Sequence, residues 1–166
     1  MIKQANIEFE QLEEKEFDSP MGEATGAAAI FGVTGGVMEA ALRSVSEILT
    51  GEELEKIEFK EIRGEQGIKR ASLKLGERDI KVVVAHGLGN AQTIMEEIKS
   101  GKADYQFVEI MACPGGCIMG GGQPIKNSKI RGTIDVRRKR AEAMYSIDEK
   151  SKIRKSHENP ILKQIY

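Results

Sequence analysis

The part of the sequence that decides the fold is residues 81–112, which read KVVVAHGLGNAQTIMEEIKSGKADYQFVEIMA. Near its start lie three consecutive valines, Val82 to Val84, a run that is typical of a strand buried on both faces. Apolar residues at helical spacing follow up to Gly101, and Asn90 is expected to cap this helix. Residues 104–112 then indicate a second strand. A strand, a helix and a strand at this spacing predict a βαβ unit, in which the two strands are parallel neighbours.

Further helices and strands are expected around this unit. An apolar pattern at helical spacing covers residues 38–49, and helices are also expected at 134–146 and after Pro160. Residues 56–63 and 68–75 have strand-like composition, and the glycines between them predict an antiparallel hairpin. The predicted fold class is therefore α/β: a mixed sheet with a βαβ unit and flanking helices, plus a basic helical C-terminal extension.

Charge divides the chain into two parts, for which we predict domains at 1–125 and 126–166. Residues 1–125 contain 13 Lys/Arg and 21 Asp/Glu, whereas residues 126–166 contain 12 and 5. We expect the basic extension to lie across an acidic surface of this chain or of a partner, and a solvated basic helix is the alternative. Nucleic-acid binding is disfavoured, because the extension has few aromatic residues that could stack on bases.

Composition indicates a globular protein outside the membrane. The 166 residues are 40% hydrophobic and 31% charged, which suits one ordinary domain with a core. The sequence has no apolar run of membrane-spanning length, and residues 1–17 are polar and acidic, unlike a signal peptide. We therefore expect a cytoplasmic location.

The segment that carries chemistry is residues 109–124, which read EIMACPGGCIMGGGQP. Its two cysteines, Cys113 and Cys117, directly follow the second strand of the expected βαβ unit. Soft thiolate ligands select iron–sulfur clusters, zinc or copper(I). Glycines let a backbone approach a bulky ligand closely, and their N–H groups can donate to sulfur. Ligands of α/β sheets bind beyond the carboxyl ends of parallel strands, where this loop is expected.

Spacing alone leaves the two cysteines open to three interpretations: a redox pair, part of a metal site, or small apolar residues in the core. His86 is expected at the same sheet edge, but a hydrogen-bonded loop histidine is the simpler interpretation. His157 is expected to cap or pack within the extension. Residues 32–36, GVTGG, precede a helix as a phosphate loop would, but they lack the required lysine and serine or threonine.

The whole string at 109–124 resembles the third signature motif of iron-iron hydrogenases, which has the pattern E-x-M-A-C-x-G-G-C-x-x-G-G-G-Q-P. Residues 17–22 (FDSPMG) and 26–43 (GAAAIFGVTGGVMEAALR) resemble the loop and helix between the second and third cysteine motifs of this family. Residues 154–160 (RKSHENP) resemble its small-subunit region, here placed behind the catalytic lobe. The resemblance covers nearly the whole chain.

The resemblance implies roles for individual residues. In this family the H-cluster is a 4Fe-4S cubane joined through one cysteine sulfur to a di-iron unit. By resemblance, Cys113 is a cubane ligand and Cys117 is the bridging thiolate. Met111 lines the pocket of the di-iron unit, and Phe31 and Gly32 approach its carbonyl and cyanide ligands.

The other two cysteine motifs of the family, one containing T-S-C-C-P and one beginning M-P-C, are not found in this sequence. They supply the remaining cubane ligands. The resemblance therefore implies part of an iron-iron hydrogenase that reduces protons to dihydrogen reversibly, and only with a complementing N-terminal half. Ferredoxin or a nicotinamide-linked subunit is the implied electron-transfer partner. The alternatives are a hydrogenase-like iron–sulfur assembly or sensory protein without hydrogenase activity, and an iron-free binding or structural module.

The βαβ unit also makes a geometric prediction that needs no resemblance. The loops after His86 and after Ala112 should flank one crevice, because parallel strands end at the same sheet edge. Both thiols should point toward that crevice or toward the surface where a second half would dock. Antiparallel strands, or thiols buried in the core, would remove this physical support.

Overall fold

The computed structural model describes most of the chain, namely residues 1–17, 24–54, 58–64 and 66–165. Residues 18–22 of the first hydrogenase-like segment and residues 56–57 of the first expected strand lie outside the described residues. Within the described ranges, none of the helices is long and apolar enough to cross a membrane.

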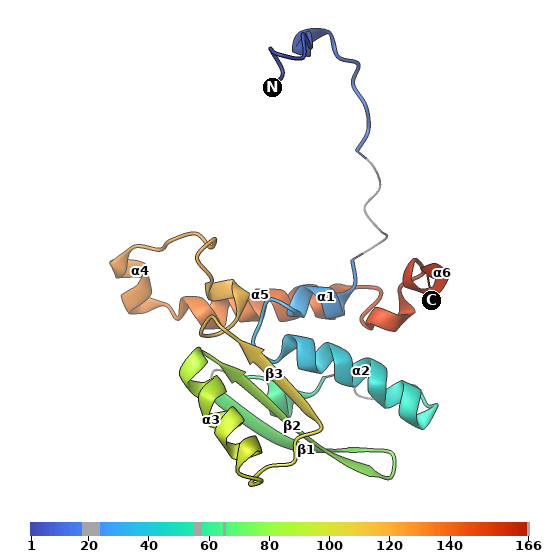
Figure 1. Cartoon of the computed structure of the whole chain (residues 1–166), viewed down its shortest axis with the longest axis vertical. Coiled ribbons are helices and arrows are strands. Elements are labelled where there is room, and N and C mark those ends of the chain that lie inside the picture. Colours follow the sequence, from blue (N-terminus) through green and yellow to red (C-terminus); the bar gives the residue numbers. More distant parts are fainter. Residues whose placement is uncertain (18–23, 55–57, 65, 166) are drawn as a thin grey trace.

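The centre of the fold is a three-stranded sheet with the order β1-β2-β3 (Figure 1). The strands are β1 (Ile68–Leu75), β2 (Arg78–His86) and β3 (Phe107–Met111). Strand β1 is antiparallel to β2, whereas β2 is parallel to β3. Helix α3 (Leu88–Lys99) connects β2 to β3. The predicted βαβ unit and the mixed α/β fold class are therefore confirmed.

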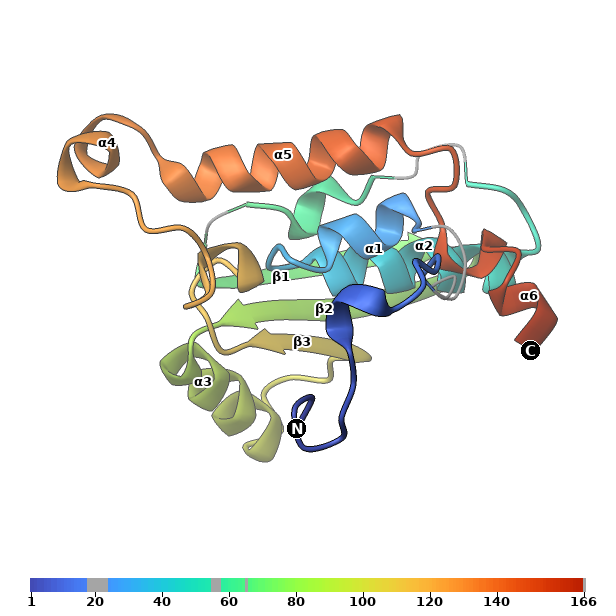
Figure 2. The same ribbon diagram turned by 90° about the horizontal axis from the view of Figure 1, so that it is seen from above.

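Strand β2 is buried on both faces, as its valines predicted. Val82 and Val84 lie in one core cluster with Met38 and Leu42 of helix α2 (Gly36–Thr50). Val83 and Ala85 lie in a second cluster with Ile94 of α3. The sheet is thus the middle layer of three, with α3 on one face and α2 on the other (Figure 2).

The predicted hairpin is wrong in its pairing. Residues 68–75 do form a strand, but Lys60–Ile62 forms a 3₁₀ helix and inserts Ile62, which is fully buried, into the core. Strand β1 instead pairs with β2. The two strands are joined by a tight turn at Gly76 and Glu77, and Gly76 has a φ of 62°. The expected pairing does not form because Ile62 packs into the core and because the turn at Gly76 brings β2, and not residues 58–63, beside β1.

Asn90 does not cap helix α3 as expected. The helix begins at Leu88, two residues earlier, and its N-cap is Gly87 with a φ of 82°. The Asn90 side chain instead donates a hydrogen bond to the His86 carbonyl oxygen at 2.7 Å. Because Gly87 makes the turn, Asn90 ties the first turn of the helix back to the end of β2.

The other expected helices are present. Helix α2 ends before Gly51, which has a φ of 70°. The extension contains a long helix, α5 (Val136–Lys150), and a short final helix, α6 (Leu162–Ile165). The structure also contains α1 (Gly26–Ile30), α4 (Ser128–Thr133) and the 3₁₀ helices Phe9–Gln11, Cys117–Met119 and Ser156–Glu158. Helix α1 contacts both α2 and α5, so it links the extension to the body of the protein.

A buried ion cluster joins the extension to α2. Arg43 of α2 is 0% exposed and contacts both carboxylate oxygens of Asp148 on α5, at 2.7 and 2.8 Å. It also bonds Glu39 at 2.8 Å, and Glu39 accepts from Arg63 as well. Arg154 pairs with both Asp148 and Glu58.

The second contact of the extension with an acidic surface is made by Lys155, which pairs with Glu47 of α2 at 2.7 Å. The pairs of Arg154 and Lys155 confirm that the basic extension lies across acidic groups of this chain. The buried pair between Arg43 and Asp148 has the opposite arrangement, since its cation comes from the body and its carboxylate from the extension.

Candidate functional site

The carboxyl ends of β2 and β3 lie side by side, which confirms the geometric prediction for these strands. His86, the last residue of β2, is in register with Met111, the last residue of β3. The Gly87 N–H donates to the Met111 carbonyl oxygen at 2.8 Å, so the two following chain segments start together. His86 itself is buried, and Met111 is partly buried.

The cysteine loop, residues 113–119, continues from this edge. Cys113 is partly exposed, Cys117 is exposed, and both are free thiols. Cys117 begins the 3₁₀ helix Cys117–Met119. The interpretation of the cysteines as small apolar core residues is therefore wrong, because neither residue is buried.

Two glycines inside the loop are required by its own geometry. Gly115 and Gly116 are buried and have φ values of 87° and 96°. A Cβ atom at Gly116 would lie 2.6 Å from the Gly32 carbonyl oxygen. By contrast, a Cβ at Gly121 or Gly122 would meet no atom of the described residues within 4 Å. The need for glycine at 115 and 116 is thus internal to this chain, whereas packing within the chain does not explain the later two.

The connection between α1 and α2, residues 31–35, lies against the cysteine loop. The Thr34 N–H donates to the Gly115 carbonyl oxygen at 3.2 Å, and the Ile118 N–H donates to the Gly32 carbonyl oxygen at 3.1 Å. The structure therefore brings Gly32, more than 80 positions earlier in the sequence, into contact with the loop. The neighbouring Phe31 is exposed.

Two buried charges that the sequence did not single out lie behind this connection. Glu109 of β3 accepts the N–H groups of Gly35 and Met38, each at 2.6 Å. Lys69 of β1 donates to the Thr34 carbonyl oxygen at 3.0 Å. Burial raises the pKa of the Glu109 carboxyl and lowers that of the Lys69 ammonium to about 8. The alternation of side chains along β1 and β3 predicts that both residues lie on the same face of the sheet. It does not predict that either residue is buried.

Helix α5 supports the cysteine loop from the other side. Arg140 donates to the carbonyl oxygens of Ile118 and Pro124, both at 2.7 Å. The aliphatic part of Arg137 covers Gly115, where a Cβ would approach it within 2.8 Å. A surface hollow of about 330 Å³ lies between the glycine run 120–121 and Arg140. The basic residues of α5 thus hold the loop in place.

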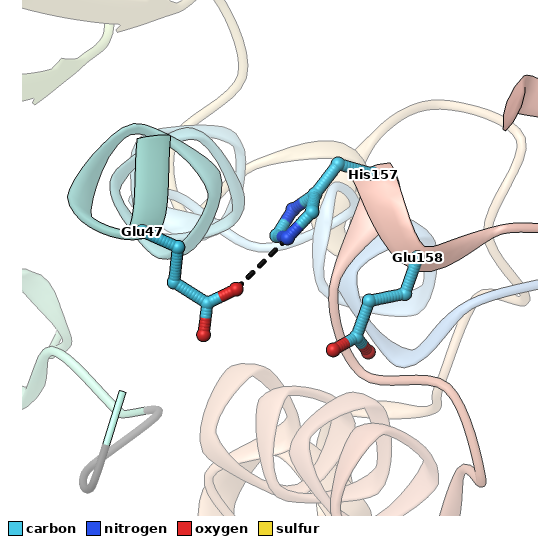
Figure 3. Close-up of side chains that lie close together, drawn as sticks. All are labelled: Glu47, His157 and Glu158. Carbon is cyan, nitrogen blue, oxygen red and sulfur yellow. Dashed lines mark hydrogen bonds and ion pairs between the residues drawn. The ribbon is translucent and has the colours of Figure 1, made fainter. Parts of the chain in front are cut away.

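His157 does not pack within the extension as expected, because its ring contacts helix α2 of the body. Its ring nitrogens contact Ser44 Oγ at 2.9 Å and Glu47 Oε2 at 2.8 Å. Figure 3 shows Glu47, His157 and Glu158, whose ligand-type atoms lie within 4.8 Å of one another. The Lys155 ammonium already bonds both carboxylates, at 2.7 and 2.9 Å, and these ion pairs raise its pKa although burial opposes them. The Lys155 ammonium therefore already neutralises the carboxylates that a metal ion would need.

The chain matches two protein families along nearly its whole length. Residues 1–121 match the family described as iron only hydrogenase large subunit, C-terminal domain. Residues 134–166 match the family described as iron hydrogenase small subunit. The first match includes the cysteine loop, and the second includes most of the extension.

Curated relatives and solved structures agree with these matches. The chain is 46% identical over all 166 residues to the NADP-reducing hydrogenase subunit HndD of Solidesulfovibrio fructosivorans and to iron hydrogenase 1 of Clostridium pasteurianum. It spans only 28% and 29% of these two relatives. The protein NAR1 of Arabidopsis thaliana is 37% identical over 128 residues, which are 74% of this chain and 27% of that protein.

A solved structure of the FeFe-hydrogenase HydA1 from Chlamydomonas reinhardtii superposes with a TM-score of 0.62 at 38% identity, covering 99% of this chain and 47% of that one. The fold and the sequence thus point to one family. The chain belongs to the family of the iron-only hydrogenase large subunit, C-terminal domain, and continues into a region of the small-subunit family.

Proposed function

We propose that this chain is part of an iron-iron hydrogenase that reduces protons to dihydrogen reversibly, together with a complementing half that carries the two missing cysteine motifs. The observation that carries the proposal is the cysteine loop itself. It follows a parallel strand, leaves Cys113 partly exposed and Cys117 exposed, and is held against residues 32–34 by two backbone hydrogen bonds. The relatives named as hydrogenases support the same assignment.

The donor set fits half of the coordination that a cubane needs. Thiolates are the ligands that iron–sulfur clusters require, and a 4Fe-4S cluster takes about four of them. Cys113 would hold the cubane, and Cys117 would bridge it to the di-iron unit of the H-cluster. When bound, the H-cluster would supply the redox-active metal centre for hydrogen chemistry, and the electrons would come from a separate donor. The remaining ligands would come from the complementing half.

Other residues of this chain would shape the site. Met111, at the end of β3, and the segment Phe31–Gly32 would form the wall around the di-iron unit. The open space around Gly121 and Gly122 suits close approach of a bulky group or of the complementing half. The division into 1–125 and 126–166 and a cytoplasmic location are part of the same proposal, although one relative is named as a periplasmic hydrogenase subunit.

Electrons would be exchanged with a separate protein or subunit. The name of one relative, an NADP-reducing hydrogenase subunit, supports a nicotinamide-linked partner, and ferredoxin is the other candidate. We propose no role for nucleic acid or membrane.

The test uses this chain produced anaerobically with a complementing half, loaded with iron and compared with two serine variants. Cys117→Ser should abolish retention of the di-iron unit, measured by the infrared bands of its carbonyl and cyanide ligands, because the bridge needs a soft sulfur. Cys113→Ser should mainly weaken the cubane, measured by its paramagnetic spectrum. Equal retention of the di-iron unit in both variants would sink the assignment of roles.

A second candidate function is an iron–sulfur assembly protein without hydrogenase activity. Relatives named as cytosolic iron–sulfur assembly factors match at 26% to 35% identity. The two candidates differ in one outcome of the same experiment. Hydrogen production by the loaded complex supports the hydrogenase, whereas a stable cubane without a di-iron unit and without hydrogen production supports the assembly protein.

A further inference from the structure

The connection between α1 and α2, residues 31–35, lies between the sheet and the cysteine loop. On the loop side it makes two backbone hydrogen bonds, from Thr34 N–H to Gly115 and from Ile118 N–H to Gly32. On the sheet side it meets two ionisable side chains, Glu109 and Lys69, which are only 7% and 4% exposed.

Glu109 replaces a cap that the local sequence cannot provide. Helix α2 begins after Gly35, which has no side chain to accept the free N–H groups of the first turn. Larger residues are excluded nearby, because a Cβ at Gly35 would lie 2.4 Å from the Ile62 carbonyl oxygen and one at Gly36 only 1.7 Å from that of Ile30. The carboxylate of Glu109 accepts the Gly35 and Met38 N–H groups instead.

Lys69 holds the same connection by one carbonyl group, that of Thr34, and ties it to the segment before β1. Its ammonium donates to the Thr34 carbonyl oxygen at 3.0 Å and to that of Gly64 at 3.2 Å. Thr34 is therefore bonded on both sides of its backbone, by Lys69 through its carbonyl and by Gly115 through its N–H. An anion and a cation from two different strands thus fix one short segment.

The cost of burying these charges points to a role beyond stability. A buried charge is expensive to desolvate, and replacing such groups by apolar ones is often neutral or stabilising. We infer, building on the proposed function, that Glu109 and Lys69 are positioning residues that fix where residues 31–35 meet the cysteine loop. They act through the hydrogen bonds that they make with the backbone of Thr34, Gly35 and Met38.

The test measures site-resolved amide hydrogen exchange by NMR in this chain without iron, so its outcome does not depend on hydrogen production. The reporters are the N–H groups of Thr34 and Ile118, which bridge the two segments and bond neither positioning residue. Amides of the β1–β2 ladder, such as Val83, are the internal reference. The variants are Glu109→Gln, Glu109→Ala and Lys69→Met, with the exposed strand residue Lys74→Met as a matched control.

Exchange at Thr34 and Ile118 should become at least about tenfold faster in Glu109→Ala and Lys69→Met, because each loses charge-assisted hydrogen bonds. Glu109→Gln keeps one acceptor oxygen and should lie between the wild type and Glu109→Ala. Exchange at Val83, and at all three sites in Lys74→Met, should stay unchanged.

Three results would overturn the assignment. Exchange at Thr34 and Ile118 could stay unchanged in the folded variants, or rise in parallel with Val83, which would mark a merely structural role. If neither Glu109→Gln nor Lys69→Met folds, the two residues serve the fold as a whole and the proposal is wrong. If the variants show the expected exchange changes but the loaded wild-type complex produces no hydrogen, the result counts against the proposed function alone.

Discussion

The junction between α2 and α5 and the surface around the cysteine loop are built in opposite ways. At the junction, Arg43, Glu39 and Asp148 are fully buried, and each charge meets a partner of opposite sign. Around the cysteine loop, Cys117 and Met119 are exposed, and Ile125 just beyond it is 94% exposed.

The difference shows which contacts this chain completes by itself. The ion cluster needs only the body and its own extension, so folding of the chain should satisfy it. Exposed apolar side chains beside two free thiols and a glycine run support the proposal that a complementing half covers this surface. Contacts within the chain therefore satisfy the charged groups at the C-terminal end of α5, whereas apolar side chains near its N-terminal end stay exposed.

The largest effect is expected at the junction. Arg43→Ala would leave Asp148 and Glu39 buried without their main cation and should lower the free energy of unfolding by about 3–5 kcal/mol. The matched control is Arg138→Ala on the exposed face of α5, which pairs with Glu142 and should cost less than about 1 kcal/mol. Urea unfolding measures both. Similar losses in the two variants would show that the junction is not special.

The next effect concerns pH and the buried Lys69. Burial lowers its pKa in the folded protein to about 8, from an ordinary value of 10.5. Between these values the unfolded chain binds more protons, so stability should rise with pH, by about 2 kcal/mol from pH 7.5 to 9.5. Urea unfolding of Lys69→Met should lack this rise. A rise of equal size in the variant would mean that another group causes it.

The smallest effect is expected at the start of α5, on the open side of the molecule. The Asp135 side chain accepts the Arg138 N–H at 3.0 Å and caps the helix. Asp135→Ala should cost about 1 kcal/mol by thermal or urea unfolding, while Asp135→Asn should cost much less because asparagine also caps. A loss as large as that of Arg43→Ala would contradict the difference drawn between the two regions.

The sequence predicted the βαβ unit because its signals are local. Three adjacent valines and a helical apolar pattern each require only neighbours along the chain. The position of the thiols then followed from the rule that parallel strands end together. The hairpin prediction failed because strand composition at 56–63 could not show that Ile62 fills the core, and because the tight turn at Gly76 was not recognised.

The buried charges could not be predicted in the same way. Arg43, Lys69 and Glu109 are residue types that usually face solvent, and each becomes buried only because its partner arrives from a distant segment. Asp148 lies 105 positions after Arg43, and Gly35 lies 74 positions before Glu109. The residue roles of Cys113, Cys117, Met111, Phe31 and Gly32 stay predictions that rest on resemblance and on the position of the loop.

The most direct test of the central claim is the iron content of this chain alone, purified anaerobically after reconstitution with iron and sulfide, with its oligomeric mass measured in the same sample. Two thiolates leave about half of a cubane's coordination unfilled, so we expect a monomer that retains far less than about four irons and shows no stable cubane spectrum. Adding a complementing half should bring the iron to that value. About four irons per monomer in the isolated chain, with a cubane spectrum and no dimer that pools four cysteines, would contradict the claim that this chain carries half of the site.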